Sequence, residues 1–414
     1  MLYHSKIKQN SELNIKEGLS GSSFINSYPQ RIIVQVTNRC QLQCPMCLIN
    51  EDRKLIDLPD EVLSKLEEVI PYTTYVALSG GEPLLYKKLP DFFDKFAKPD
   101  GPIIDFVTNG ILLDDKLIIN IVEKGVAVYI SLNGATKETH ELTRPGTRFE
   151  DLLGKFRKLS DLKKKTKSKT LIGISYVMIK NNMAEMPKII DLMENLGIDT
   201  IRFAYYLAGS EYQRQNYLPD QDKKILNQYF LETRIRAFEK KITAYVPKFY
   251  VINEDEEYNS SMGNMERKYP TIENPLMQTF NSTNYFGNSW ECHEPWTTAI
   301  IDMEGLVHPC CMSYVTLGDL KKQSFSEIWN GELYKSLRST INTKHMPQYC
   351  RECPTYSSNY PASLRAPEPV DIGSKHEENR ITSLIKLGAH YLEAEGIAST
   401  TKRLNAFVMR RLKK

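Results

Sequence analysis

Short apolar runs alternate with stretches of helical periodicity over the first half of the chain. Such runs are typical of buried strands, and the stretches between them repeat apolar residues at helical spacing. Six strands in β–α alternation predict an α/β fold whose parallel sheet closes far enough to make a partial (β/α)6 barrel, similar to a TIM barrel. The expected strands are Ile32–Val36, Tyr75–Leu78, Ile103–Val107, Ala127–Leu132, Leu171–Met178 and Ile201–Phe203.

The alternation stops after residue 209. Residues 210–290 are rich in tyrosine, asparagine and charged residues, with one expected helix around Asp220–Lys240. We interpret this insert as a cover that contacts substrate, with a partly ordered linker as the alternative. A β-hairpin with Gly305 in its turn and a helix over Phe325–Arg338 follow. The expected domains are an irregular N-terminal arm (1–28), the barrel (29–209), the insert (210–290), a small module (291–360) and a helical tail (361–414).

Composition gives the chain no particular partner. The 414 residues carry 54 basic and 51 acidic side chains, a net charge of +3. The basic run Lys155–Lys169 is interpreted as a solvated helix face, so no nucleic acid is expected. Export and membrane spanning are not expected either, because an apolar signal region and an 18-residue apolar run are both absent. The amphipathic end Thr401–Lys414 either docks on an anionic membrane or packs on the barrel, and packing is favoured.

The eight cysteines fall into two clusters separated by a long cysteine-free stretch. Cys40, Cys44 and Cys47 follow the first strand in a C-x3-C-x2-C spacing. Cys292, Cys310, Cys311, Cys350 and Cys353 form the second cluster. This distribution fits metal ligation in a reducing cytosol better than a disulfide framework.

Three thiolates on one loop can hold three irons of a [4Fe–4S] cube and leave the fourth open, with a zinc site or unrelated thiols as the alternative. The spacing of Cys40, Cys44 and Cys47 resembles that of the radical S-adenosylmethionine (SAM) superfamily. The resemblance implies that SAM chelates the open iron through its amino and carboxylate groups. It also implies that one electron cleaves SAM to a 5′-deoxyadenosyl radical, which takes a hydrogen atom from substrate. An electron donor such as flavodoxin or ferredoxin is therefore expected.

Two further strand ends carry the same resemblance. Gly80-Gly81-Glu82-Pro83 resembles the GGEP motif whose backbone holds the SAM amino group. Ser131 and Asn133, in the SLNGA segment, stand where a hydroxyl and an acid contact the SAM ribose and carboxylate. Asn133 replaces the usual acid, so it can bond a ribose hydroxyl but adds no charge. A helix-capping turn is the alternative for both residues.

Three more residues are candidates for SAM contacts. Met46 precedes the third cysteine, where an aromatic residue near the adenine is common in the superfamily. Asn181, or its neighbour Asn182, ends the fifth strand and faces the site unless both are plain turn residues. Arg202 on the sixth strand can form paired hydrogen bonds with a carboxylate of SAM or substrate.

The second cluster supplies four thiolates, from Cys292, Cys310, Cys350 and Cys353, which can close an iron–sulfur cluster or a tetrahedral zinc site. With the Pro-Trp, Leu-Gly-Asp-Leu and Ile-Trp-Asn segments, the pattern resembles the SPASM/twitch modules of radical SAM enzymes. The resemblance implies one auxiliary [4Fe–4S] cluster. Cys311 is left over as a spare thiol, an alternative ligand to Cys310, or a hydrogen-atom donor to a substrate radical.

Within the family that the chain resembles, such modules serve peptide maturation by crosslinking, epimerisation or oxidation, and the dehydrogenation of carbohydrate-like alcohols. The tyrosine-rich insert and the open barrel favour a peptide substrate. A small carbohydrate-like substrate is the first alternative, and a non-catalytic iron–sulfur or zinc protein is the second.

Overall fold

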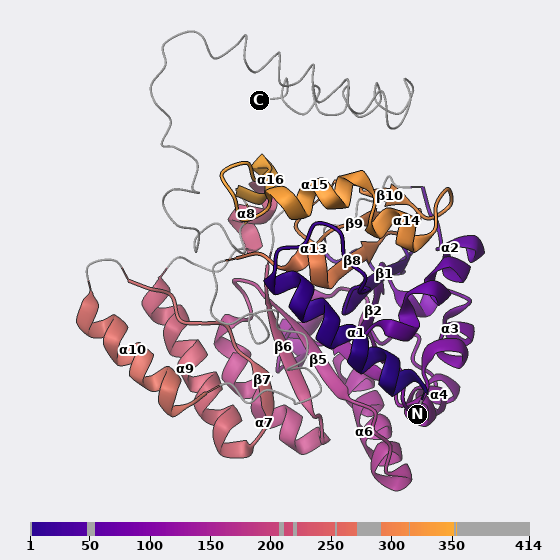
Figure 1. The fold of residues 1–414 in the computed structure, drawn as a ribbon. Coiled ribbons are helices and arrows are strands. Elements are labelled where there is room, and N and C mark those ends of the chain that lie inside the picture. Colours follow the sequence, from indigo (N-terminus) through magenta and orange to yellow (C-terminus); the bar gives the residue numbers. More distant parts are fainter. Residues whose placement is uncertain are drawn as a thin grey trace. The chain divides into compact units, whose positions relative to one another are not determined.

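The architecture is described from a computed structural model (Figure 1). It describes residues 2–47, 54–206, 211–217, 222–252, 255–270, 291–313, 315–351 and 353. The chain divides into two compact units, residues 1–361 and 362–414. The predicted helical tail, with its amphipathic end, lies outside the described residues.

One sheet organises the first unit, with ten strands among the described residues in the order β10-β9-β8-β1-β2-β3-β4-β5-β6-β7. Its six central strands run parallel in chain order, which confirms the predicted partial barrel. A seventh parallel strand, β7 (Thr243–Tyr245), extends it beyond the prediction. Because all seven are parallel, their carboxyl ends share one edge. The six are β1 (Arg31–Thr37), β2 (Tyr75–Gly80), β3 (Ile103–Thr108), β4 (Ala127–Ser131), β5 (Ile172–Met178) and β6 (Thr200–Tyr205).

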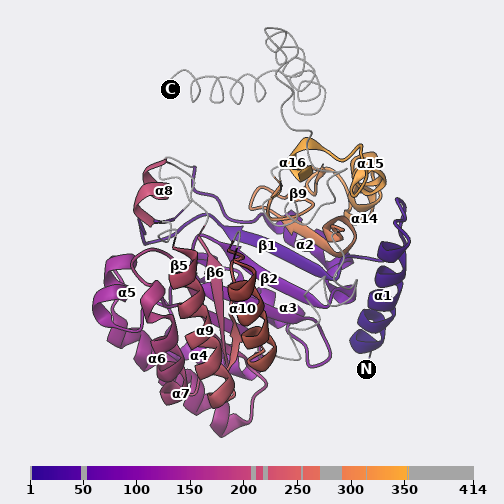
Figure 2. The ribbon, with the colours of Figure 1, turned by 90° about the vertical axis from the view of Figure 1, so that its left-hand side faces the viewer.

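Amphipathic helices connect these strands and cover the outer face of the sheet (Figures 1 and 2). Most bury an apolar stripe, as α4 (Asp115–Lys124) does through Ile118, Ile121 and Val122, whereas α5 (Lys137–Thr143) buries His140 and Thr143. After the cysteine loop, the short helix α2 (Asp60–Lys65) is followed by the 3₁₀ turns η1 (Leu66–Glu68) and η2 (Ile70–Tyr72). The others are α3 (Leu89–Phe96), α4 (Asp115–Lys124), α5 (Lys137–Thr143), α6 (Phe149–Thr166) and α7 (Met186–Leu196), with the turns η3 (Pro83–Leu85) and η4 (Met183–Glu185). Among the described residues, no helix is long and apolar enough to cross a membrane.

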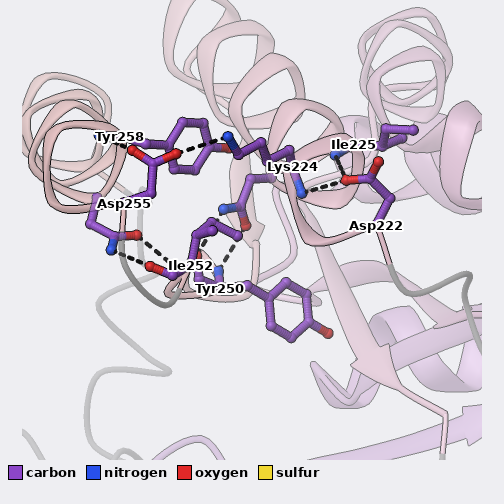
Figure 3. Close-up of polar contacts among 9 residues, drawn as sticks. Asp222, Lys224, Ile225, Tyr250, Ile252, Asp255 and Tyr258 are labelled. Atoms are coloured by element: carbon purple, nitrogen blue, oxygen red, sulfur yellow. Dashed lines mark hydrogen bonds and ion pairs between the residues drawn. The ribbon is translucent and has the colours of Figure 1, made fainter.

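The described residues of the insert form the predicted helix as α9 (Lys223–Lys240), and two helices that the sequence did not indicate, α8 (Glu211–Tyr217) and α10 (Glu256–Lys268). Asp222 caps α9 by accepting from the backbone N–H groups of Lys224 and Ile225 (Figure 3). The Lys224 ammonium pairs with Asp255, the cap of α10, at 2.8 Å. The starts of the two long helices are therefore tied together.

The C-terminal module continues the barrel sheet. The predicted hairpin forms from β8 (Thr298–Ile301) and β9 (Leu306–His308), and Gly305 has the positive φ of 84° that its turn requires. Strand β8 pairs in parallel with β1, with Arg31 opposite Thr298. The single helix predicted over Phe325–Arg338 is in fact two. The module also contains α13 (Glu294–Thr297), β10 (Gly318–Asp319), α14 (Phe325–Trp329), α15 (Glu332–Thr340) and α16 (Gln348–Arg351).

The prediction of an irregular N-terminal arm is wrong, because Leu2–Leu19 form helix α1. Its buried face is polar, consisting of Asn10, Asn14 and Glu17, so apolar periodicity could not reveal it. These side chains bond backbone groups elsewhere; the Asn14 amide, for example, donates to the Trp296 carbonyl at 2.7 Å. The first thirty residues thus fasten the module to the barrel.

Candidate active site

The carboxyl ends of the barrel strands and the cysteine loop surround an open cavity of about 1080 Å³. Eight predicted residues line it: Cys40, Cys44, Met46, Cys47, Gly80, Gly81, Glu82 and Ser131. Pro83 lies just behind, buried at the start of η3. The structure therefore brings the C-x3-C-x2-C loop and most of the predicted SAM-contacting residues to one place.

The two glycines of the GGEP segment lie against the backbone that enters the cysteine loop. The Gly81 N–H donates to the Thr37 carbonyl and the Glu82 N–H to the Arg39 carbonyl, both at 2.7 Å. A Cβ atom on Gly80 would lie 2.0 Å from the Thr37 oxygen, and one on Gly81 would lie 2.1 Å from the Arg39 oxygen. The close approach of the Thr37 and Arg39 backbone therefore requires glycine at both positions, independently of any contact with a ligand.

The Glu82 carboxylate joins the ends of β2 and β3. It is buried and accepts from the Thr108 hydroxyl at 2.7 Å, the Asn109 N–H at 2.7 Å and the Leu84 N–H at 3.1 Å. Burial raises the pKa of Glu82, and these hydrogen bonds oppose the rise. Its side chain therefore organises the rim of the cavity.

Ser131 and Asn133 have different surroundings. Ser131 lines the cavity, whereas Asn133 is fully buried and is not among the described lining residues. The Asn133 amide oxygen accepts from the Val177 N–H at 3.0 Å, and its Nδ2 has no partner among the described residues. Because Asn133 is fully buried, the structure does not show this NH₂ group reaching a ligand in the cavity, and the predicted ribose contact stays a prediction.

Two predicted SAM contacts lie elsewhere. Asn181 is exposed and is not among the described lining residues, while Asn182 is buried and bonds the backbone of Ile179 and Val177. Arg202 finds its carboxylate within the chain, at 2.8 Å from Asp105. It sits early on β6, toward the amino end of the barrel strands, so the predicted pairing with SAM or substrate is corrected to an internal ion pair.

Sequence reasoning missed Arg144, which lines the cavity in the turn after α5. Burial lowers the pKa of its guanidinium, and the negative charge that Cys44, Cys47 and Cys40 carry as thiolates opposes this. Its buried Nε has no hydrogen-bond partner among the described residues. The only signal was an arginine before Pro145-Gly146, and nothing in the pattern showed that this turn reaches the cysteines.

Aromatic residues at the end of β6 were also missed. Tyr205 and Tyr206 line the cavity, and Tyr206 packs with Met46 and Ile179 in a small buried cluster. Met46 is thus buried beside an aromatic ring, and its predicted contact with SAM stays a prediction. The signal was the pair of tyrosines directly after a predicted strand.

The second cavity, of about 590 Å³, is lined by all four cysteines that were predicted to hold an auxiliary cluster: Cys292, Cys310, Cys350 and Cys353. Burial raises the pKa of the Cys310 and Cys350 thiols to about 12. Cys311 lines this cavity too and is not among the described residues of the first. An all-sulfur donor set of this kind suits an iron–sulfur cluster or zinc.

Strand β1 connects the two cavities. The cysteine loop follows its carboxyl end, while Arg31 at its start pairs at 3.0 Å with Glu294, which lines the second cavity. With seven residues, β1 is roughly 20 Å long at about 3.3 Å per residue. Figure 2 shows β1 running between the module and the side where α8 lies.

Comparisons with known proteins agree with this geometry. The Radical SAM superfamily model matches residues 34–193, and the SPASM model, an iron–sulfur cluster-binding domain, matches residues 292–354. The chain is 23% identical to a PqqA peptide cyclase of Granulibacter bethesdensis, over 78% of this chain and 79% of that protein. It is 24% identical to an AdoMet-dependent heme synthase of Methanosarcina barkeri, over 76% and 86%.

A solved structure shares the fold. SuiB of Streptococcus suis bound to S-adenosylmethionine aligns with a TM-score of 0.54 at 15% identity, covering 78% of this chain and 70% of that one. The cofactors that follow are SAM, a [4Fe–4S] cluster and an auxiliary cluster, and the two sulfur-lined cavities fit them. The chain is an enzyme of the radical SAM superfamily with a C-terminal SPASM iron–sulfur cluster-binding domain.

Proposed function

We propose that Cys40, Cys44 and Cys47 hold the SAM-binding [4Fe–4S] cluster and that SAM fills the adjoining part of the first cavity. The three residues lie on one loop and line one cavity. Three cysteine ligands leave one iron of a [4Fe–4S] cluster available to SAM. When bound, the cluster supplies the electron that cleaves SAM to the 5′-deoxyadenosyl radical. The chain's own task is to orient SAM and substrate around that point.

Arg144 is the proposed partner of the SAM carboxylate. It is a cation beside the cysteine loop, and its buried Nε has no partner among the described residues. A guanidinium can form two parallel hydrogen bonds with a carboxylate, which gives orientation as well as affinity. Met46 and Tyr206 offer an apolar surface for the adenine, and Ser131 offers a hydroxyl to the ribose.

Cys292, Cys310, Cys350 and Cys353 are the proposed ligands of the auxiliary cluster. Because they provide four sulfurs in one cavity, every iron can have a protein ligand. Cys311 then remains as a spare thiol or an alternative ligand. Its position among these cysteines does not support hydrogen donation to a radical formed in the first cavity.

The proposed reaction is hydrogen abstraction from a peptide, leading to its crosslinking, epimerisation or oxidation. The observation that carries it is the first cavity, which lies at the carboxyl ends of the barrel strands and is open to solvent beside the cysteine loop. SAM and a residue of a longer substrate can therefore share it. Relatives named as PqqA peptide cyclases in three organisms, and SuiB solved with its precursor peptide SuiA, support the same substrate class.

The test is incubation of the reduced, iron-loaded enzyme with SAM and synthetic peptides taken from short reading frames beside its gene. The proposal predicts that one peptide raises 5′-deoxyadenosine formation and changes mass by a defined amount. An iron porphyrin and an amino-sugar alcohol form the comparison arms, the first because of the relative named as a heme synthase. A response to either, with none to any peptide, would replace the peptide assignment.

A further inference from the structure

The sulfur of Cys40 receives a side-chain contact that the proposed function does not use. The Asn109 Nδ2 lies 3.9 Å from Cys40 Sγ, within the range of a weak N–H···S hydrogen bond. Asn109 is buried at the end of β3 and lines the first cavity. A backbone donor, the Leu42 N–H, approaches the same sulfur at 3.5 Å.

The orientation of the Asn109 amide is fixed by its other contacts. Its oxygen accepts from the Gln41 side chain at 3.2 Å and from the Ile111 N–H at 3.0 Å. With both donors on the oxygen, the NH₂ group must be the end that faces Cys40. The Asn109 backbone N–H is held separately by the Glu82 carboxylate at 2.7 Å.

We propose that Asn109 is a positioning residue that sets the reduction potential of the SAM-binding cluster by donating to the Cys40 sulfur. The inference rests on the proposed assignment of Cys40 as a cluster ligand. A hydrogen bond to a ligating thiolate stabilises the more negative, reduced cluster and so raises its potential. The Gln41 side chain donates to the Asn109 amide oxygen and so keeps the Asn109 NH₂ group oriented toward Cys40.

The test is a potentiometric titration of the full-length, iron-loaded enzyme without SAM, followed by electron paramagnetic resonance. Asn109→Leu keeps the size of the side chain and removes the donor, together with the oxygen that accepts from Gln41 and from the Ile111 N–H. It is expected to lower the ratio of reduced to oxidised SAM-binding cluster about tenfold at a fixed potential, a shift of about 59 mV for one electron. Asn109→Asp replaces the donor by an acceptor and is expected to shift the potential further in the same direction.

The auxiliary cluster in the same sample is the internal control, and its potential is expected to stay unchanged. If Asn109→Leu binds too little iron, Gln41→Leu decides, because it keeps Asn109 and loosens its amide, which predicts a smaller shift of the same sign. Unchanged potentials in fully loaded variants, or an equal shift of both clusters, overturn the inference. A native enzyme with no SAM-sensitive cluster signal overturns the proposed function instead, and this inference with it.

Discussion

The two sulfur-lined cavities differ in donor number and in surroundings. The first has three cysteines, an open volume of about 1080 Å³ and polar neighbours such as Arg144 and Asn109. The second has five cysteines in about 590 Å³, with Leu337, Ile341 and Met312 among its lining residues. Open coordination with polar groups nearby suits a cluster that binds a small molecule, whereas a full sulfur set among apolar residues suits one that stays closed.

Removing a ligand from the first cavity is expected to have the largest effect. Cys47→Ala leaves two thiolates on the loop, so the SAM-binding cluster and its four irons should be lost. SAM cleavage should then fall to background, measured as 5′-deoxyadenosine, while the auxiliary cluster is retained. Substantial cleavage by this variant would contradict the assignment of the first cavity.

Ligand removal in the second cavity separates the necessary thiols from the spare one. Cys350→Ala should lose the auxiliary cluster, about four irons, and keep the SAM-binding cluster. Cys311→Ala is the matched control and should bind as much iron as the native enzyme. If instead Cys311→Ala loses iron and Cys310→Ala does not, Cys311 is the ligand.

We expect the stability of the C-terminal module, which forms the second cavity, to depend on a buried arginine. Arg338 is 2% exposed and donates to the carbonyls of Pro295, Trp329 and Ser23, so it ties the module to the N-terminal segment. Arg338→Met should lower the free energy of unfolding by about 3 kcal/mol, because buried acceptors lose a charged donor. Anaerobic urea denaturation measures this. Lys335→Met on the same helix should change it by less than about 0.5 kcal/mol.

In the first cavity, Arg144→Gln tests the proposed carboxylate contact. Loss of a charge-assisted hydrogen bond, worth about 1.5–3 kcal/mol, should weaken SAM binding by about 10- to 100-fold. Equilibrium dialysis with labelled SAM measures the change, and Arg144→Lys should recover part of the affinity. Equal binding by the native and Gln forms would show that SAM does not use Arg144.

The smallest effect concerns His140, which is fully buried between the Asn133 N–H and the Thr147 hydroxyl. Burial lowers its pKa to about 4. The unfolded chain, with a pKa near 6.5, then binds the proton first, so stability should fall as pH drops below about 6.5. From pH 6.5 to 5.5 the expected loss is about 1 kcal/mol, and His140→Gln should remove this slope. If the native protein and His140→Gln lose the same stability between pH 6.5 and 5.5, groups other than His140 cause the loss.

The sequence was most informative where apolar pattern and burial coincide. All six predicted barrel strands are confirmed. The clearest is β4, which is buried along its whole length and forms a continuous apolar run. Helix α1 escaped detection because its buried face is made of Asn10, Asn14 and Glu17. The parallel pairing of β8 with β1 could not be read either, because it joins segments that lie far apart in the chain.

The candidate site divides in the same way. Local motifs located the cysteine loop and the GGEP segment, since their spacing lies within one turn or loop. Arg144 and Asn109 reach the cysteines only through the fold, so their contacts needed the structure. Arg202 shows the converse error, because an isolated basic residue on a strand does not reveal which carboxylate it meets.

The difference between an open and a closed cluster is tested most directly by adding SAM to reduced enzyme and recording the electron paramagnetic resonance spectrum. Two double variants, Cys350→Ala with Cys353→Ala and Cys44→Ala with Cys47→Ala, each retain one cluster. The account predicts that SAM changes the spectrum of the first double variant and leaves that of the second unchanged. A SAM-dependent spectral change in the second double variant, which retains the auxiliary cluster, would contradict it. So would an unchanged spectrum in the first, which retains the cluster at Cys40, Cys44 and Cys47.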